Sequence, residues 1–233
     1  MNLFYQPEIQ KLQQLSEEES RHAIKVLRLK ERDEIHVIDG VGGLYRCEIS
    51  KAHDKKCEFR ILDTKQSFGK QAYRFHLVIA PTKNLDRIEW MVEKCVEIGI
   101  DEISFIQTRY SERKEIKIPR IEKVAIGAMK QSLKAYLPKI NEIQTWKSFL
   151  ANVPEANFHV IAHLEEGERT LLKDIPMQKQ SICVLIGPEG DFSPEEIEQA
   201  LSNGFKPVSL GESRLRTETA GLVACHTANL LNQ

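Results

Sequence analysis

The chain has 233 residues with a formal net charge of −1, and 41% of its residues are hydrophobic while 29% are charged. This composition is typical of a folded globular protein with enough apolar residues for a core, and the near-zero charge does not by itself indicate a nucleic-acid partner. The net charge is +1 over residues 1–70, +4 over 71–150 and −6 over 151–233. Either the first two thirds carry a basic surface, or solvated helices differ in charge by chance.

Cysteine spacing and hydropathy exclude several classes of protein. The five cysteines lack the C-x-x-C spacing of a zinc site, and their odd number argues against a disulfide framework, so we expect a reducing compartment and no metal. No apolar run approaches the ~20 residues of a membrane span. The N-terminal MNLFYQPEIQ lacks the regions of a signal peptide. We therefore expect a cytoplasmic chain without a membrane segment.

Residues 1–70 are predicted to form a small β-rich domain with one helix. Ser16 and Glu19 match a capping box that opens a helix through about Leu29. The stretches EIHVID, LYRCEIS and CEFRILD then alternate as strands do, which favours a small barrel or barrel-like sheet. The polar stretch TKQSFGKQA (64–72) has the composition of a linker.

Residues 73–233 are predicted to form a second, α/β domain. The stretches RFHLVIA, EISFIQ, FHVIAHL, SICVLIG and KPVSLG are typical of buried strands. Helices are expected over residues 85–98, closed by Gly99, and from Pro119 through about Tyr136. Strands that alternate with helices indicate a parallel α/β sheet.

The stretch IGPEGDFSPEEIEQAL (186–201) combines a glycine turn with a helix start. Ser193, Pro194 and Glu196 are an N-cap, a first-turn proline and a capping-box glutamate. The Gly-Pro-Glu-Gly turn before them follows a strand, where open α/β sheets bind ligands. Because Glu189 and Asp191 would repel a phosphate, this turn favours a cationic ligand or a proton acceptor.

A second loop with the same character lies in SLGESRLRTETAGL (209–222). Arg216 stands beside a predicted helix N-terminus, which already carries partial positive charge. Arginine in that position often serves an anion such as a nucleic-acid phosphate. The alternative is a surface arginine paired with Glu218 or Glu212.

Together these two stretches resemble the SPOUT superfamily of RNA methyltransferases, and more narrowly the ribosomal small-subunit methyltransferase E family. His22, Val26 and Arg28 are similar to an element of that family's N-terminal domain, and the segments around Lys83–Gly99 and 130–138 resemble the middle of its catalytic domain. The resemblance implies a trefoil-knotted SPOUT methyltransferase domain over residues 73–233, preceded by a PUA-like β-barrel RNA-binding domain over 1–70. It implies an enzyme that methylates N3 of a uridine in 16S rRNA.

The resemblance also implies S-adenosylmethionine as cofactor, held in a bent shape mostly by backbone groups of three loops. Glycines let the backbone approach the ligand, and Leu210 and Leu215 would enclose the adenine. Carried onto this chain, the implied cofactor-binding residues are Ala162, His163, Leu164, Ile186, Gly187, Gly190, Leu210, Gly211, Leu215, Arg216, Thr217 and Ala220.

Catalysis and RNA binding follow from the same resemblance. Arg216 is expected to stabilise the deprotonated uracil or to bind a flanking phosphate, and either Glu189 or Glu218 is expected to accept the N3 proton. The expected partners are 16S rRNA in the 30S subunit and a second copy of the chain in a homodimer. The expected RNA-binding residues are His22, Arg28, Lys83, Arg109, Arg113, Lys130 and Lys134.

The chain departs from the family pattern at Asp191, where glycine is usual, and at Ser213 and Arg214, where an arginine and an aliphatic residue are common. Lys130 and Lys134 stand where glutamate and arginine are expected. These departures bear on substrate contacts more than on the cofactor. Two alternatives stay open: a SPOUT enzyme that methylates ribose 2′-oxygens of tRNA or 23S rRNA, and a non-catalytic RNA-binding ribosome-assembly factor.

Overall fold

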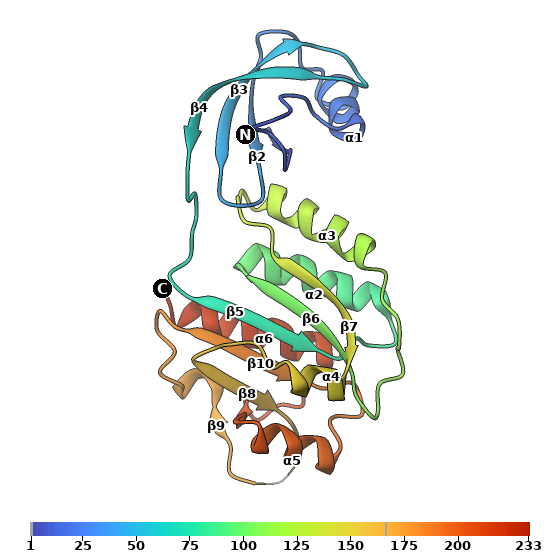
Figure 1. Ribbon diagram of the computed structural model, residues 1–233, viewed down its shortest axis with the longest axis vertical. Helices are drawn as coiled ribbons and strands as arrows, with labels where there is room; N and C mark the ends of the chain where they lie inside the picture. The colour runs from blue at the N-terminus through green and yellow to red at the C-terminus, as the bar shows by residue number, and fades with distance from the viewer. Residues whose placement is uncertain (1, 166) are drawn as a thin grey trace. The chain divides into compact units, whose positions relative to one another are not determined.

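The computed structural model describes residues 2–165 and 167–233, and its chain divides into two compact units (Figure 1). The first unit contains the residues up to Lys70 together with Ile126–Leu137. The second contains Gln71–Ala125 and Pro138–Gln233. The first unit therefore includes a segment, Ile126–Leu137, that the sequence analysis assigned to the second domain.

The first unit is built on a four-stranded sheet in the order β1-β2-β3-β4. The strand β1 runs parallel to β2, whereas β2, β3 and β4 pair antiparallel. Alternate residues such as Ile35, Val37 and Ile49 are fully buried, as expected for strands with one face on a core. The elements are β1 (Leu3–Tyr5), α1 (Glu17–Arg21), the π-helix η1 (His22–Val26), β2 (Glu34–Ile38), β3 (Leu44–Lys51) and β4 (Glu58–Lys65).

The helix of the first unit ends earlier than predicted. Ser16 caps it as expected, with its hydroxyl accepting a hydrogen bond from the Glu19 N–H at 3.2 Å. The path then widens into the π-helix, which stops at Val26 rather than Leu29. The reason is local: the Leu29 N–H turns back to the Ala23 carbonyl while Arg28 adopts a left-handed φ of 57°.

The second unit is an α/β fold around a seven-stranded sheet in the order β7-β6-β5-β10-β8-β11-β9. Each neighbouring pair is parallel, which confirms the predicted parallel α/β fold. The elements from β5 onward are β5 (Arg74–Ile79), α2 (Leu85–Ile98), β6 (Glu102–Gln107), α3 (Ile118–Gln131), β7 (Lys139–Thr145), α4 (Trp146–Ala151), β8 (Phe158–Ala162), β9 (Thr170–Leu171), the 3-10 helix η2 (Leu172–Asp174), β10 (Ser181–Ile186), α5 (Pro194–Ser202), β11 (Lys206–Ser209) and α6 (Thr217–Leu230). Helix α3 begins in the second unit, and its residues from Ile126 onward belong to the first.

Helix α3 stops at Gln131 instead of the predicted Tyr136. Leu133 takes a left-handed φ of 57°, and the Lys134 N–H closes the helix by donating to the Met129 carbonyl. The chain then extends, and Tyr136 forms an antiparallel bridge with Val41 inside the first unit. The predicted end was wrong because residues 132–136 have favourable helix propensities, whereas the pairing of Tyr136 with Val41 requires an extended chain there.

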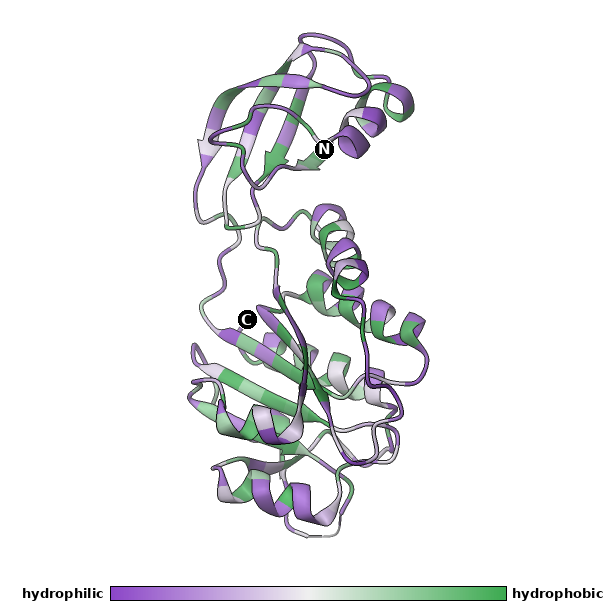
Figure 2. Ribbon diagram, turned by 45° about the vertical axis from the view of Figure 1, so that its right-hand side comes forward, coloured by the Kyte–Doolittle hydropathy of each residue, from purple (hydrophilic) through white to green (hydrophobic). Residues whose placement is uncertain are grey.

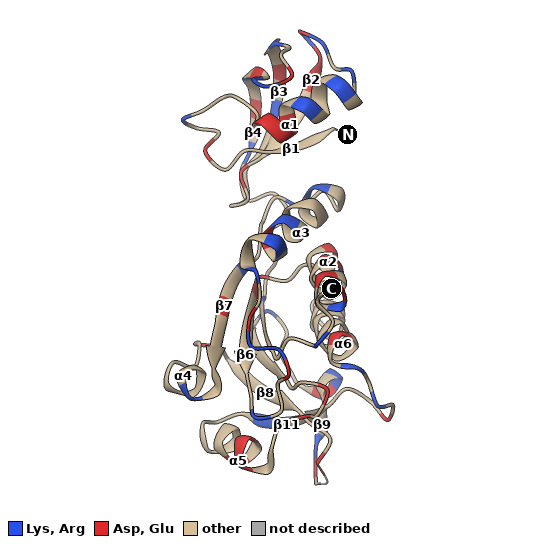
Figure 3. Ribbon diagram, turned by 90° about the vertical axis from the view of Figure 1, so that its right-hand side faces the viewer, with Lys and Arg blue, Asp and Glu red and all other residues tan. Residues whose placement is uncertain are grey.

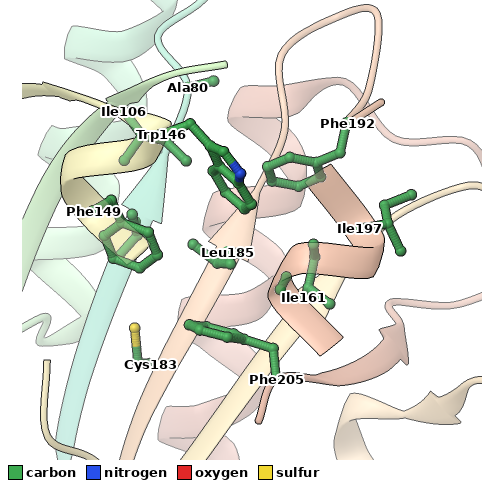
Figure 4. Close-up of a cluster of buried hydrophobic side chains, with 12 residues drawn as sticks. Ala80, Ile106, Trp146, Phe149, Ile161, Cys183, Leu185, Phe192, Ile197 and Phe205 are labelled. Atoms are coloured by element: carbon green, nitrogen blue, oxygen red, sulfur yellow. The ribbon is translucent and has the colours of Figure 1, made fainter. Parts of the chain in front are cut away.

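The large sheet is covered on both faces. On one face, α4 and α5 bury a cluster with Trp146, Phe149, Phe192 and Phe205 at its centre (Figure 4). The strands beneath are strongly hydrophobic, as sheets buried on both faces require (Figure 2). On the other face, α6 packs against α2, β5 and β10.

Gly221 allows α6 to lie close to its neighbours. A Cβ at this position would stand 2.7 Å from the Met91 sulfur of α2 and 3.2 Å from Ile79 Cδ1 of β5. The first contact is shorter than real Cβ atoms make and the second is tight, so a larger residue would require its neighbours to shift. The position of the α6 N-terminus, which carries Arg216 and Glu218, depends on this packing.

Replacing Gly221 by valine should lower the free energy of unfolding by about 1–3 kcal/mol because it overpacks the α2–α6 contact. Chemical denaturation followed by circular dichroism measures the change. The matched control is Gly127→Val, also inside a helix, where a Cβ would meet nothing within 4 Å. An equal loss in both variants would show that helix propensity, rather than packing, sets the effect.

Candidate active site

Three loops at the carboxyl ends of neighbouring strands enclose one cavity. Because β10, β8 and β11 are adjacent and parallel, the chain segments that follow them leave the sheet at the same edge. They line a cavity of about 750 Å³, called here the first cavity. Its size lies within the roughly 300–1,000 Å³ of small-molecule sites.

The Gly-Pro-Glu-Gly turn after β10 is held from two sides. The Glu189 carboxylate accepts a hydrogen bond from the Lys83 N–H at 3.0 Å, which ties the turn to the loop after β5. Gly190 lies against Tyr110 of the loop after β6, where a Cβ would be 3.1 Å from Tyr110 Cβ. The turn is therefore fixed by its neighbours as well as by its own proline.

Asp191 joins two of the three loops. One of its carboxylate oxygens accepts the Leu164 N–H at 2.7 Å and the other accepts the Phe192 N–H at 2.8 Å. Its φ is 64°, a conformation that aspartate and asparagine tolerate better than most residues. Asp191 therefore links the loops after β8 and β10 through hydrogen bonds from backbone N–H groups.

His163 is buried beside that link. Within the described residues, neither ring nitrogen has a hydrogen-bond partner, and its backbone carbonyl accepts a hydrogen bond from Arg169. Burial, the largest cause, lowers the pKa of His163, with Arg169 lowering it further and Asp191 opposing. The ring is therefore neutral at neutral pH, with one nitrogen free to donate and the other to accept.

The N-terminus of α6 supplies the charged groups of the third loop. Arg216 is the N-cap residue and is exposed, whereas Glu218 in the first turn is only 6% exposed. The Arg87 Nε of α2 lies 3.8 Å from a Glu218 carboxylate oxygen. Of the two acids predicted as proton acceptors, Glu218 is thus buried with a cationic neighbour, and Glu189 is exposed with an N–H donor.

The first cavity brings together most of the residues expected to bind a cofactor. They line it from all three loops: Ala162, His163, Leu164, Ile186, Gly187, Leu210, Gly211, Leu215, Arg216, Thr217 and Ala220. Gly190 is not among the lining residues and faces Tyr110 instead. Arg87, Arg169 and Asp191 also line the cavity. The sequence analysis placed Asp191 in the ligand-binding turn but gave Arg87 and Arg169 no role there.

The residues expected to bind RNA are distributed over both units. Within the first unit, His22 begins the π-helix, Arg28 is exposed, Lys134 is half-buried, and Lys130 is ion-paired with Glu19. The Glu19 carboxylate, predicted to complete the capping box with Ser16, is thus bound to Lys130. Basic residues recur along α3 (Figure 3).

Within the second unit, the remaining three cations surround the Gly-Pro-Glu-Gly turn. Lys83 pairs with Glu112 at 2.9 Å, and Arg109 pairs with Glu195 at 3.0 Å. Arg113 donates to the Thr82 carbonyl at 3.0 Å. The exposed ion pairs are weak, so a phosphate can compete for these cations.

Residues 2–165 and 167–233 lack two kinds of feature. Those residues contain no cluster of three or more His, Cys, Asp or Glu side chains suited to a metal ion. They also contain no helix long and apolar enough to cross a lipid bilayer.

Comparison with known families defines the class of protein. The model of an RNA methyltransferase domain matches residues 70–229, and the model of an RNA methyltransferase PUA domain matches residues 15–62. The fold and the cavity are thus those of an RNA methyltransferase with an N-terminal PUA domain.

Individual relatives narrow the class. The ribosomal RNA small subunit methyltransferase E of Aquifex aeolicus is 30% identical over 229 residues, which cover 94% of this chain and 95% of that protein. A Porphyromonas gingivalis crystal structure, described as a probable rRNA methyltransferase, has a TM-score of 0.94 at 44% identity over 100% of this chain and 98% of its own. The Neisseria gonorrhoeae ribosomal RNA small subunit methyltransferase E, crystallised with S-adenosyl methionine, has a TM-score of 0.88 at 27% identity, covering 100% and 98%. The chain belongs to the ribosomal RNA small subunit methyltransferase E family.

The Asp191 link predicts a change in local opening. In Asp191→Ala, the Leu164 amide loses its acceptor, and we expect it to exchange with solvent deuterium about tenfold faster. Asp191→Asn keeps an acceptor oxygen and tolerates the same φ, so it should stay near the wild-type rate. The exchange rate of the Leu164 amide is measured by NMR on the ligand-free proteins. Equal rates in all three proteins would mean that the Asp191 hydrogen bond does not order the loop after β8.

Proposed function

We propose that this protein transfers a methyl group from S-adenosylmethionine to N3 of a uridine in 16S rRNA within the small ribosomal subunit. The observation that carries the proposal is the first cavity, formed by three loops in a chain of this family. The protein then works in the cytoplasm, where ribosomal subunits are assembled.

The residues of the first cavity suit the cofactor. A Cβ at Gly187 would lie 3.1 Å from the Phe192 ring, so backbone rather than side chain meets the ligand there. Leu210, Leu215 and Ile186 offer apolar contact for an adenine. When bound, S-adenosylmethionine supplies a methyl group on a cationic sulfonium, and the carboxylates of Glu189, Asp191 and Glu218 favour that charge.

Two structural expectations belong to the same proposal. Strand β11 lies beyond β8 in the sheet, and the chain that follows it returns to form α6 against β5 and α2. We infer that this returning segment passes through the loop after β10 and forms a trefoil knot. We also infer that two copies of the chain form a homodimer, as the family resemblance implies. Light scattering at assay concentration measures the molar mass and so tests this inference.

The chain's own groups would handle the proton and the charge of the acceptor. The N3–H bond of uracil must break, with its proton passing to a carboxylate, and the new N3–methyl bond forms as the sulfur–methyl bond breaks and the sulfur keeps that electron pair. Glu218 suits this role better than Glu189, because it is a buried carboxylate in the wall of the cavity, whereas Glu189 already accepts the Lys83 N–H. Arg216, exposed at the cavity, would stabilise negative charge on the uracil oxygens.

RNA binding is assigned to two groups of cations. In the first unit, the PUA-type RNA-binding domain, the exposed His22 and Arg28 face solvent. In the second, Lys83, Arg109 and Arg113 would contact backbone phosphates beside the target. Lys130 is less suited to this role because Glu19 already neutralises it.

Methyl transfer from labelled S-adenosylmethionine tests the proposal. The acceptors are 30S subunits, free 16S rRNA and tRNA, followed by nucleoside analysis of each product. N3-methyluridine from 30S subunits is the expected result. A 2′-O-methyl nucleoside would assign the protein to the ribose-methylating branch, and RNA binding without transfer or cofactor binding would indicate an assembly factor.

Variants of the charged groups test the assigned roles. Glu218→Gln should lower kcat by about 100-fold or more, as expected for loss of a general base, whereas Glu189→Gln should lower it far less. Arg216→Ala should also reduce turnover strongly, because the charge on the acceptor is then unopposed. Calorimetry should find S-adenosylmethionine affinity within a few-fold of wild type in Arg216→Ala; a large loss there would reassign that residue to cofactor binding.

A further inference from the structure

A second cavity adjoins the first in the second unit. Its volume is about 400 Å³, and it is lined by Asp86, Arg87, Trp90, Arg216, Glu218 and Thr219. Arg87, Arg216 and Glu218 line the first cavity as well. The two cavities therefore share a charged wall, and a ligand in one lies beside a ligand in the other.

Trp90 distinguishes the second cavity from an ordinary surface hollow. Helix α2 turns Ile88, Met91, Val92 and Cys95 into the core, and Trp90 lies off that apolar stripe. It is 44% exposed, whereas the other tryptophan, Trp146, is 8% exposed and packs in the core cluster. An exposed indole beside a cavity offers the flat apolar face on which nucleic-acid bases stack.

The charges around Trp90 favour an uncharged ligand. Two arginines, Arg87 and Arg216, face two acids, Asp86 and Glu218, so the lining has no formal net charge. A phosphate would meet both carboxylates at close range. A neutral ring with N–H and carbonyl groups along its edge can instead donate to an acid and accept from an arginine.

We propose that the second cavity holds the acceptor base, a uracil ring that stacks on Trp90. This inference rests on the proposed function and specifies where the substrate binds. The shared wall then has a clear purpose: Glu218 meets the N3–H of the ring, while Arg216 or Arg87 meets its carbonyl oxygens. Transfer needs the reacting atoms about 3–3.5 Å apart, which adjoining cavities allow and separate ones do not.

Trp90 is thus a substrate-binding residue from a helix that carries none of the family's loop motifs. It also recognises the base rather than the backbone, so its loss should affect RNA and leave the cofactor alone. The base must leave its stack to reach the cavity, as enzymes that act on bases require.

Steady-state methyl transfer with Trp90→Ala and Trp90→Phe tests the proposal. Loss of a stacking contact should lower kcat/KM for 30S subunits by about 5- to 100-fold in Trp90→Ala. Trp90→Phe, which keeps an aromatic face, should stay within about threefold of wild type. S-adenosylmethionine affinity should be unchanged in both. The control Leu230→Ala, which removes an exposed apolar side chain from α6 instead of α2, should behave as wild type.

Tryptophan fluorescence provides an independent readout. With S-adenosylhomocysteine present, titration with a short oligouridine should quench the wild-type protein and leave Trp90→Phe unquenched, because the remaining Trp146 is buried. Quenching that persists in Trp90→Phe would overturn the stacking assignment.

The outcomes separate the two proposals. Normal kcat/KM in Trp90→Ala, with an active wild-type enzyme, would overturn the base subsite and leave the proposed function intact. Equal losses in Trp90→Ala and Trp90→Phe, together with a shift from dimer to monomer in light scattering, would identify Trp90 as a subunit contact and also overturn it. A wild-type protein that methylates no RNA would remove the proposed function, and the subsite with it.

Discussion

The close packing of α6 on α2 and β5 is the contact on which the site depends. Gly221 removes the side chain that would hold the helices apart, and the α6 N-terminus then lies at the edge where β10, β8 and β11 end. Arg216 and Glu218 enter the site only because this helix is anchored there. Core packing far from any ligand thus sets the geometry of the charged groups.

The loops of the site are held in place by hydrogen bonds between side chains and backbone groups. Glu189 binds the Lys83 N–H and Asp191 binds the Leu164 N–H, so each acid of the glycine turn ties it to another loop. Charge-assisted bonds of this kind are stronger than neutral ones. A site assembled from loops becomes more rigid when its acids bind backbone groups in this way. Glu218, which is buried and makes no such bond to another loop, is the acid to which we assign the substrate proton.

Several helices and caps of this fold could be predicted from residue patterns. The helix over 85–98 and the capping box at Ser193, Pro194 and Glu196 were predicted correctly, because both depend on contacts within a few residues. Strands β7 and β9 were missed, since β7 is a polar, half-buried edge strand and β9 has two residues. The first helix ends early because Arg28 adopts a left-handed φ and the Leu29 N–H turns back to Ala23, and α3 ends early because Tyr136 pairs with Val41 across the first unit.

The sequence by itself determined the α/β class, because strand and helix patterns are local signals. Its resemblance to a known family implied the loops that line the first cavity. Tertiary structure alone decided that Arg87 and Trp90 adjoin Glu218, and that Lys130 is neutralised by Glu19. On α2 and α3 these residues lie on the polar side of the helix, where the pattern predicts only solvent. Which of them meets a partner depends on contacts over more than a hundred residues, and no local periodicity records those.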